Sequence, residues 1–297
     1  MQKEYRALEF FSGIGAFAQV SKLFETEVIH AFDQGQDANS VYELNYNHRP
    51  SSRNLDSIKL DQIDKVDIWW MSPPCLPYTR KGNGADVQDP RSHSFLNLTN
   101  LVAGKLPDRI FIENVPEFKN SKAMQLLENT LEQAMYSFKT FDLCSSQLGI
   151  PMLRRRFFLA ASRCSQIEDI EIKSPAQMRE LSDFINSNDD DSLYLDEFML
   201  SKLDAFDIVS ESSMQVTCFT SSYGKQHKAS GSLLRTKDNR IRYFAAEEIV
   251  ALLGFSPNFK FPRHMKNQTK WRLAGNSVDT RLISLLLEAS GLKNKNG

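Results

Sequence analysis

The sequence predicts an α/β fold: a parallel sheet of the Rossmann type, covered by helices on both faces and interrupted by a small insertion. Apolar segments typical of strands alternate with helix-like segments through residues 1–163. Residues 164–240 break this alternation, because they are polar, rich in serine and aspartate, and poor in periodic segments. Helical periodicity returns after residue 240. We therefore expect a main domain of residues 1–163 and 241–297, with residues 164–240 as a small separate region.

Each expected element follows from its local pattern. Short apolar segments between turn residues predict strands at residues 6–11, 27–33, 66–72, 107–115 and 154–162. Apolar residues spaced three and four apart predict helices at residues 16–24, 38–47, 123–135, 245–255 and 277–290. Parallel strands end at one edge of a sheet, so residues that follow these strands should meet there.

The composition excludes several classes of protein. The apolar runs are too short to span a membrane, and the N-terminus MQKEYRALEF lacks a signal-peptide pattern. The four cysteines have no CxxC spacing and no paired histidines, so we expect neither a metal site nor disulfides. We expect reduced thiols and a cytoplasmic monomer, or a nuclear location if the source is a eukaryote.

Charge is unevenly distributed although the formal net charge is only −1. Residues 183–211 are acidic. The basic residues of the following segment are Lys225, Lys228, Arg235, Lys237, Arg240 and Arg242. A local basic patch can bind phosphate on a near-neutral protein, and a solvated surface segment is the alternative interpretation.

Candidate ligand-binding residues follow the first strands. The turn SGIG, residues 12–15, lies between the first strand and helix, where glycine allows close approach of backbone and ligand. Asp33 ends the second strand about 20 residues later, a position that commonly binds ribose hydroxyls. Asp56, after a third short apolar stretch, could accept the amino group of adenine. Either carboxylate could instead cap the next helix.

Cys75 lies in the segment MSPPCLPYTR. It follows the fourth expected strand if the short apolar stretch before Asp56 is counted as the third. Pro73 and Pro74 cannot continue a strand, so the cysteine lies in a stiff loop. It is either an inert buried thiol or a nucleophile held beside an adenosine-containing cofactor. Tyr78 and Thr79 lie just beyond it and could contact a substrate.

A carboxyl and a pair of guanidinium groups follow later strands. The apolar run RIFI should carry Glu113 to the sheet edge, where partial burial would raise its pKa and suit it to donate a proton. Alternation along the strand at 154–162 would direct Arg154 and Arg156 to one side, where they suit a phosphate or a carbonyl oxygen. A surface glutamate and a solvated strand end are the structural alternatives.

The order of these motifs resembles that of cytosine-5 methyltransferases. FFSGIG, PPC, ENV, the arginines after GIP, and AGNSV occur in the order found in that family. TCFTSSYG and GSLL, followed by IRYFAAEEIVALLGF, further resemble its RNA-directed branch, the DNA methyltransferase 2 homologues, which act on aspartate tRNA. The resemblance extends from residue 5 to about residue 288.

The resemblance implies a role for each matched position. Cys75 would be the nucleophile, and Glu113, Arg154 and Arg156 would handle the cytosine. The residues lining the S-adenosylmethionine site would be Phe11, Ser12, Ile14, Gly15, Asp33, Asp56, Ser72, Asn276 and Ser277. The residues contacting the substrate would be Tyr78, Thr79, Asn114, Cys218, Phe219, Thr220, Tyr223 and Lys225.

The aromatic residues of the inserted region would serve RNA binding if they are exposed. Phe219 and Tyr223, next to Lys225 and Lys228, would then stack on splayed bases. Core packing of Phe219 and an inert, buried Cys218 are the alternatives.

The implied chemistry needs an ionised cysteine and a proton donor, and it needs no metal. A thiolate that adds to carbon 6 makes carbon 5 nucleophilic, and we expect nearby arginines to lower the pKa of Cys75 for this purpose. Glu113 would protonate or hydrogen-bond ring nitrogen 3.

Three positions depart from the family pattern. Leu76 stands where glutamine is usual, Ala16 where a second glycine is usual, and Met152 where glutamine or asparagine is usual. Leu76 cannot donate the hydrogen bonds of a glutamine, which puts substrate positioning in question.

Three functional hypotheses follow from these observations. The first is a tRNA cytosine-5 methyltransferase. The second is a DNA cytosine-5 methyltransferase, against which the insertion is short for reading several base pairs. The third is a nucleic-acid-binding homologue with weak catalysis, of which Leu76 would be the symptom.

Overall fold

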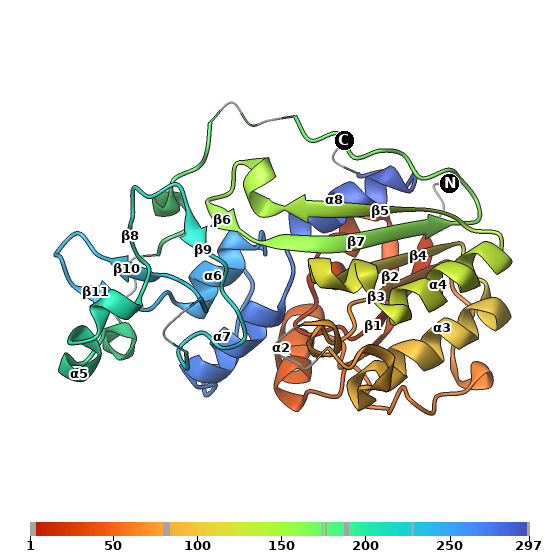
Figure 1. Ribbon diagram of the computed structural model, residues 1–297, viewed down its shortest axis with the longest axis horizontal. Coiled ribbons are helices and arrows are strands. Elements are labelled where there is room, and N and C mark those ends of the chain that lie inside the picture. Colours follow the sequence, from red (N-terminus) through yellow and green to blue (C-terminus); the bar gives the residue numbers. More distant parts are fainter. Residues whose placement is uncertain are drawn as a thin grey trace.

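The computed structural model describes residues 4–79, 84–173, 175, 177–186, 190–226 and 229–295. Figure 1 shows a larger lobe, built on a long twisted sheet, beside a smaller lobe that carries β8 (Ile208–Ser210), β10 (Leu233–Arg235) and β11 (Ile241–Arg242). Among the described residues, no helix combines the length and apolar character needed to cross a membrane.

The sheet of the large lobe has six strands in the order β2-β1-β3-β4-β7-β5. The strands are β1 (Tyr5–Phe10), β2 (Thr26–Phe32), β3 (Ile68–Met71), β4 (Arg109–Asn114), β5 (Ser137–Cys144) and β7 (Arg155–Ser162). Strands β1 to β4 are parallel, whereas β7 pairs antiparallel with both β4 and β5. The α/β class is confirmed, with one correction to the parallel sheet. The short connection between β5 and β7 leaves no crossover helix, so these strands form an antiparallel pair.

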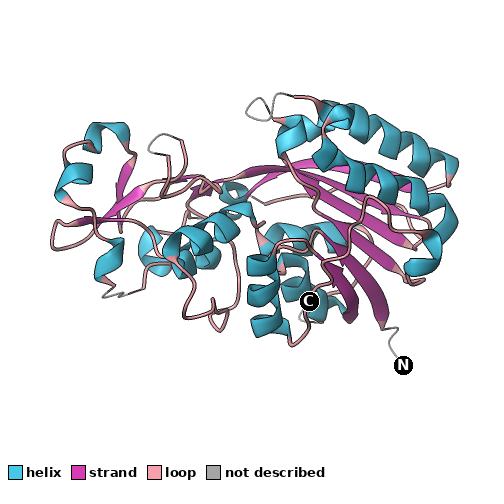
Figure 2. Cartoon of the chain, turned by 90° about the horizontal axis from the view of Figure 1, so that it is seen from below, coloured by secondary structure: helices cyan, strands magenta, loops and turns pink. Residues whose placement is uncertain are grey.

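Helices cover both faces of this sheet, as predicted. The helices of this lobe are α1 (Ala16–Ser21), α2 (Gln36–Tyr46), α3 (His93–Lys105), α4 (Lys122–Gln133) and α8 (Thr280–Ala289). Neighbouring residues of β3 point to opposite faces: Trp70 belongs to the core cluster with α1 and α8, and Trp69 to the cluster with α3 and α4. Figure 2 shows the strands of this lobe with helices on either side.

The sequence patterns missed α3, β5 and α7 (Asn267–Asn276). Serine, asparagine and threonine interrupt the apolar pattern of α3, and β5 is a mostly half-buried edge strand in which polar residues separate the apolar ones. The stretch before Asp56 was predicted to resemble a strand, but it forms only an isolated bridge between Phe32 and Ser51. Cys75 therefore follows the third strand of the sheet and not the fourth.

Part of the small lobe has a buried cluster of its own, formed by Leu195, Leu233 and Ile241, and its aromatic residues join the buried cluster that continues into the large lobe. Its three-stranded sheet has the order β11-β10-β8, and β6 (Met152–Leu153) pairs with β9 (Val216–Thr217) where the two lobes meet. Its short helix α5 (Glu197–Leu200) lies at the tip, and α6 (Ala246–Leu252) and α7 lie toward the large lobe (Figure 1). β11 begins just past residue 240 and completes this sheet. The expected division at residues 164 and 240 stays a prediction.

Candidate active site

Cys75 lies in a turn that is fixed on both sides. β3 ends at Met71, the prolines follow, and Cys75 takes a helix-like conformation (φ −81°, ψ −22°) before the turn Leu76–Tyr78. The Tyr78 amide donates to the Cys75 carbonyl at 3.0 Å. The Cys75 side chain is half-buried. The rigid loop predicted from the prolines is therefore present.

Asn114 holds this loop from the neighbouring strand. It is the last residue of β4 and is buried, and its side-chain amide donates to the Pro73 carbonyl at 3.0 Å. Its side-chain oxygen accepts from the Val115 amide at 2.8 Å. Asn114 was expected to contact substrate; in the structure its amide joins the end of β4 to the cysteine loop.

Glu113 and Arg156 face each other beside Cys75. β4 and β7 are neighbours in the sheet, and the Glu113 carboxylate lies 3.3 Å from Nε of Arg156. Glu113 is buried, and burial raises its pKa, while Arg156 and Arg154 act in the opposite direction. The predicted buried carboxyl with a raised pKa is confirmed, and such a group can donate a proton.

The charges of Glu113, Arg154 and Arg156 also act on the pKa of the Cys75 thiol. Burial raises its pKa; Arg156 and Arg154 favour the thiolate, and Glu113 opposes it. The arginines therefore act in the predicted direction, but the net shift of this pKa is upward. Desolvation outweighs the two cations, and the resting site holds a thiol.

Arg154 precedes β7 and is almost fully buried. Its Nη1 lies 3.2 Å from the Cys218 sulfur and 2.9 Å from the Phe219 carbonyl oxygen. Its Nη2 donates to the carbonyl oxygens of Gly275, at 3.0 Å, and of Ser277. The guanidinium thus bonds to three backbone carbonyls and a thiol of other segments.

The first turn of the chain forms a cradle at the carboxyl end of β1. Asp33 accepts from the amides of Gly13 at 2.9 Å and Gly35 at 2.7 Å, and burial raises the pKa of Asp33. Gly15 has φ +86°, and a Cβ there would lie 2.3 Å from a ring atom of Tyr46, so only glycine fits. Asp33 therefore joins the turn after β1 to Gly35, the residue that precedes α2.

Several expected cofactor residues lie along this edge. Phe11 takes a left-handed conformation (φ 58°), Ile14 is buried, and the buried hydroxyl of Ser12 finds no partner among the described residues. The Ser72 hydroxyl accepts from the indole of Trp70 at 2.9 Å. Asp56 lies in a loop, where it accepts a hydrogen bond from the Ser94 hydroxyl.

Asn276 and Ser277 form a turn between α7 and α8. Asn276 is exposed at the end of α7, and the Ser277 amide donates to the Ala274 carbonyl. The preceding Gly275 packs directly on the small lobe, because a Cβ there would lie 2.3 Å from backbone atoms of Thr220. The sequence analysis did not predict this contact. The glycine in AGNSV is the only sequence feature that could have indicated it.

Two of the expected base-stacking residues are not on the surface. Phe219 and Tyr223 are buried and pack against each other with ring centroids 5.0 Å apart. The Tyr223 hydroxyl donates to the Ser232 carbonyl and accepts from the Phe244 amide. The expectation that these aromatic side chains are exposed was therefore wrong, because both rings belong to the buried cluster that the two lobes share.

The remaining substrate candidates are distributed around the turn at Cys75 and the small lobe. Tyr78 is buried against Phe118, and the Thr79 hydroxyl bonds to the Leu76 carbonyl. The Thr220 amide donates to the Ser230 carbonyl, and Lys225 is exposed. Lys228 lies outside the described residues.

The basic segment is mostly neutralised by ion pairs. Arg242 forms a buried pair with Glu248 at 2.7 Å. Arg240 pairs with Asp238, and Lys237 pairs with Glu211. The local basic patch considered from the sequence is therefore reduced, because three of its members meet acidic side chains, and the choice between phosphate binding and a solvated surface stays open.

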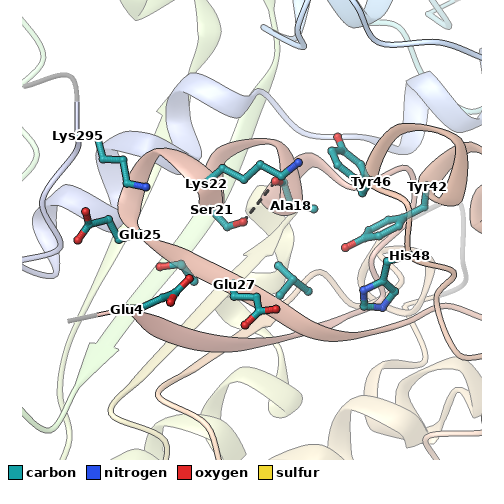
Figure 3. Close-up of a pocket in the computed structure, with 12 residues that line it drawn as sticks. Glu4, Ala18, Ser21, Lys22, Glu25, Glu27, Tyr42, Tyr46, His48 and Lys295 are labelled. Carbon is teal, nitrogen blue, oxygen red and sulfur yellow. Dashed lines mark hydrogen bonds between the residues drawn. The ribbon is translucent and has the colours of Figure 1, made fainter. Parts of the chain in front are cut away.

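One hollow of about 420 Å³ lies away from these groups. Figure 3 shows it beside α1, β2 and α2, with Lys22, Tyr46 and His48 among its lining residues. It contains none of the expected site residues. Within the described chain, no cluster of three or more histidine, cysteine or acidic side chains is arranged to bind a metal.

A thiol on a rigid loop, a buried carboxyl and a guanidinium meet at the edge of a mostly parallel sheet, in an arrangement typical of α/β enzymes. Residues 5–211 match the model of the C-5 cytosine-specific DNA methylase family, and the chain belongs to that family. It is a C-5 cytosine methyltransferase.

Individual proteins refine this assignment. The chain is 31% identical to a tRNA (cytosine(38)-C(5))-methyltransferase of Schizosaccharomyces pombe, over 96% of this chain and 98% of the relative. It is 29% identical to a DNA (cytosine-5)-methyltransferase of Dictyostelium discoideum, over 96% and 94%. The solved structure of the Entamoeba histolytica methyltransferase EhMeth superposes with a TM-score of 0.89 at 30% identity, covering 99% of this chain and all of that one. The predicted resemblance to the RNA-directed branch is confirmed.

Proposed function

We propose that this protein transfers the methyl group of S-adenosylmethionine to carbon 5 of a cytosine in tRNA, namely cytosine 38 in the anticodon loop of aspartate tRNA. The grouping of Cys75, Glu113 and Arg156 at the ends of neighbouring strands carries the proposal. The name of the S. pombe relative supports tRNA as the substrate.

The proposed reaction uses Cys75 as a covalent catalyst. Its thiolate adds to carbon 6, and the electrons of the C5–C6 double bond move toward ring nitrogen 3, where Glu113 supplies a proton. Carbon 5 would then bond to the methyl group as the methyl–sulfonium bond breaks and leaves S-adenosylhomocysteine, and the proton on nitrogen 3 would return to Glu113. Loss of the carbon 5 proton to a base, for which water is a candidate, restores the double bond and releases Cys75.

The charges around the site suggest a separate role for Glu113, for Arg156 and for Cys75. Burial raises the pKa of Glu113, which favours its protonated form, and Arg156 at 3.3 Å orients the carboxyl and would compensate the negative charge left after proton transfer. Because Cys75 rests as a thiol, its proton has to leave when the substrate binds. A cytosine in a loop reaches this site with less unstacking than one in a duplex.

The cradle at the end of β1 suits the proposed cofactor. The hydroxyl of Ser12 is buried without a partner among the described residues, and a Cβ at Gly13 would meet no atom within 4 Å, so this turn has open space beside it. Asp33, Asn276 and Ser277 lie at the same edge and would hold the adenosine and amino-acid parts. When bound, S-adenosylmethionine supplies an electrophilic methyl group on a sulfonium.

The first test is a methyl-transfer assay with labelled S-adenosylmethionine. Total tRNA and unmethylated genomic DNA are compared, with Cys75→Ala as the control. We expect label in tRNA alone, at cytosine 38 by sequencing, and loss of transfer in Cys75→Ala with cofactor binding retained. Label in DNA alone would overturn the substrate assignment, and loss of cofactor binding in Cys75→Ala would overturn the role of Cys75.

The main alternative is a DNA cytosine-5 methyltransferase, which the D. discoideum relative supports by its name. A second alternative is a weakly catalytic nucleic-acid-binding protein. Leu76 is 43% exposed beside the proposed nucleophile, and it cannot donate the hydrogen bonds of the glutamine that is usual there. A 5-fluorocytosine substrate separates this alternative from an enzyme. A covalent adduct at Cys75 supports the enzyme, and RNA binding without an adduct supports the alternative.

A further inference from the structure

The side chain of Arg154 connects three segments that are distant in the sequence. It stands between β6 and β7, and it bonds to the loop at Cys218 and Phe219 and to the turn at Gly275 and Ser277. The first of these partners belongs to the small lobe. The second leads directly to Asn276 and Ser277, which are expected to hold the cofactor.

The electrostatics of this contact are unusual for a buried cation. Arg154 is only 2% exposed, and no carboxylate of the described chain lies within ion-pair distance. In place of a carboxylate, three backbone carbonyls and the Cys218 sulfur contact the Arg154 guanidinium. Burial raises the pKa of Cys218, and Arg154 and Arg156 outweigh it, so the net shift is downward. An unpaired buried charge costs stability, so these bonds must compensate it.

An independent contact joins the same two segments. The backbone at Gly275 lies so close to Thr220 that a Cβ would meet its carbonyl atoms at 2.3 Å. A displacement of the loop at 218–220 would therefore move the turn at 275–277, and the reverse also holds. The Arg154 side chain bonds to both sides of this contact, at Phe219 and at Gly275.

We propose that Arg154 is a positioning residue that locks the cofactor turn to the small lobe and does not contact the cytosine. Both terminal nitrogens of the guanidinium are already bonded to the two segments. Its Nε is buried and has no partner among the described residues, so a direct contact with the base would have to use this atom. The identities of cofactor and base rest on the proposed function.

The test separates the two roles of Arg154 by measuring binding and chemistry independently. Arg154→Lys is compared with Arg155→Lys, its exposed neighbour, in the full-length protein. Calorimetry without RNA gives the Kd for S-adenosylmethionine, and single-turnover transfer is measured with cofactor and RNA both saturating. We expect the Kd to rise about tenfold in Arg154→Lys, with the saturated rate within about threefold of wild type. Arg155→Lys should match wild type in both.

A direct contact with the cytosine predicts the opposite pattern: an unchanged cofactor Kd and a saturated rate lower by about a hundredfold or more. That result would overturn the proposal. Because cofactor binding is measured without RNA, failure of the wild-type protein to methylate tRNA would count against the proposed function and leave this test intact.

A second pair of variants keeps the test available if Arg154→Lys does not fold, as judged by thermal melting. Cys218→Ser retains an acceptor for Nη1, whereas Cys218→Ala removes it. We expect Cys218→Ser to keep the cofactor Kd within about twofold and Cys218→Ala to raise it about three- to fivefold. Equal affinity in both variants would show that the small-lobe contact has no effect on the cofactor turn.

Discussion

The edge of the large sheet and the small lobe use their polar side chains in different ways. At the sheet edge, Glu113 and Arg156 face each other beside a half-buried thiol and remain directed at the space in front of it. In the small lobe, the Tyr223 hydroxyl and the Arg242–Glu248 pair bond within the lobe itself. The proposed chemistry therefore uses the sheet edge, whereas the polar side chains of the small lobe mainly stabilise the lobe itself.

Replacing Glu113 by glutamine gives the largest expected effect. Glutamine keeps the shape but cannot donate a carboxyl proton, so methyl transfer should fall by about 10²- to 10⁴-fold. RNA affinity should remain near wild type. The measurement is single-turnover transfer beside a binding titration. Unchanged turnover would remove Glu113 from the mechanism.

Truncating Phe219 tests the opposite character of the small lobe. The ring is 1% exposed and packs on Tyr223 and Phe244, so Phe219→Ala should lower the free energy of unfolding by about 3–5 kcal/mol. Urea unfolding measures this loss, and Phe219→Leu, which fills more of the space, should lose less. A stable Phe219→Ala protein with weakened RNA binding would instead restore the base-stacking role.

The sequence analysis predicted the sheet edge better than it predicted the small lobe. Cys75 and Glu113 follow apolar strands directly, and strand ends meet by the geometry of a parallel sheet, so local pattern was enough to bring them together. The partners of Phe219 and Arg242 come from elements that only tertiary packing brings near. Neighbouring residues do not reveal whether a ring is buried or a cation is paired.

Arg154 illustrates the same limit within the catalytic lobe. Its alternation with Arg156 was visible in the sequence, but its acceptors are carbonyls more than 60 residues away. The reversal of β7 was equally hidden, because the patterns missed the edge strand β5 that pairs with it. Sequence patterns predicted which side chains meet at the sheet edge and left the contacts that support them undetermined.

A buried carboxyl behind the sheet edge gives a pH-dependent prediction. Glu9 is buried in β1 and accepts from the Tyr42 hydroxyl at 2.8 Å, and burial raises its pKa to about 8. The folded protein holds this proton more tightly than the unfolded chain, so the stabilisation is complete below about pH 4.5. It declines as pH rises and is lost above about pH 8.

Glu9→Gln should remove that dependence. The variant should match wild type near pH 5 and exceed it near pH 8 by an amount on the order of a few kcal/mol. Thermal or urea unfolding across this pH range provides the measurement. Parallel pH profiles for the two proteins would contradict a protonated Glu9.

The smallest expected effect concerns Lys225, an exposed cation near the buried aromatics of the small lobe. Since ion pairs neutralise Lys237, Arg240 and Arg242, Lys225 is among the charges still available to RNA phosphates. Lys225→Ala should weaken RNA binding a few-fold and lower the slope of affinity against salt by about one counterion, with stability unchanged. Lys237→Ala is the matched control, and its salt slope should stay nearer to wild type because its charge already faces Glu211. Equal slopes in both variants would place the RNA away from this side of the small lobe, leaving the sheet edge to supply the contacts.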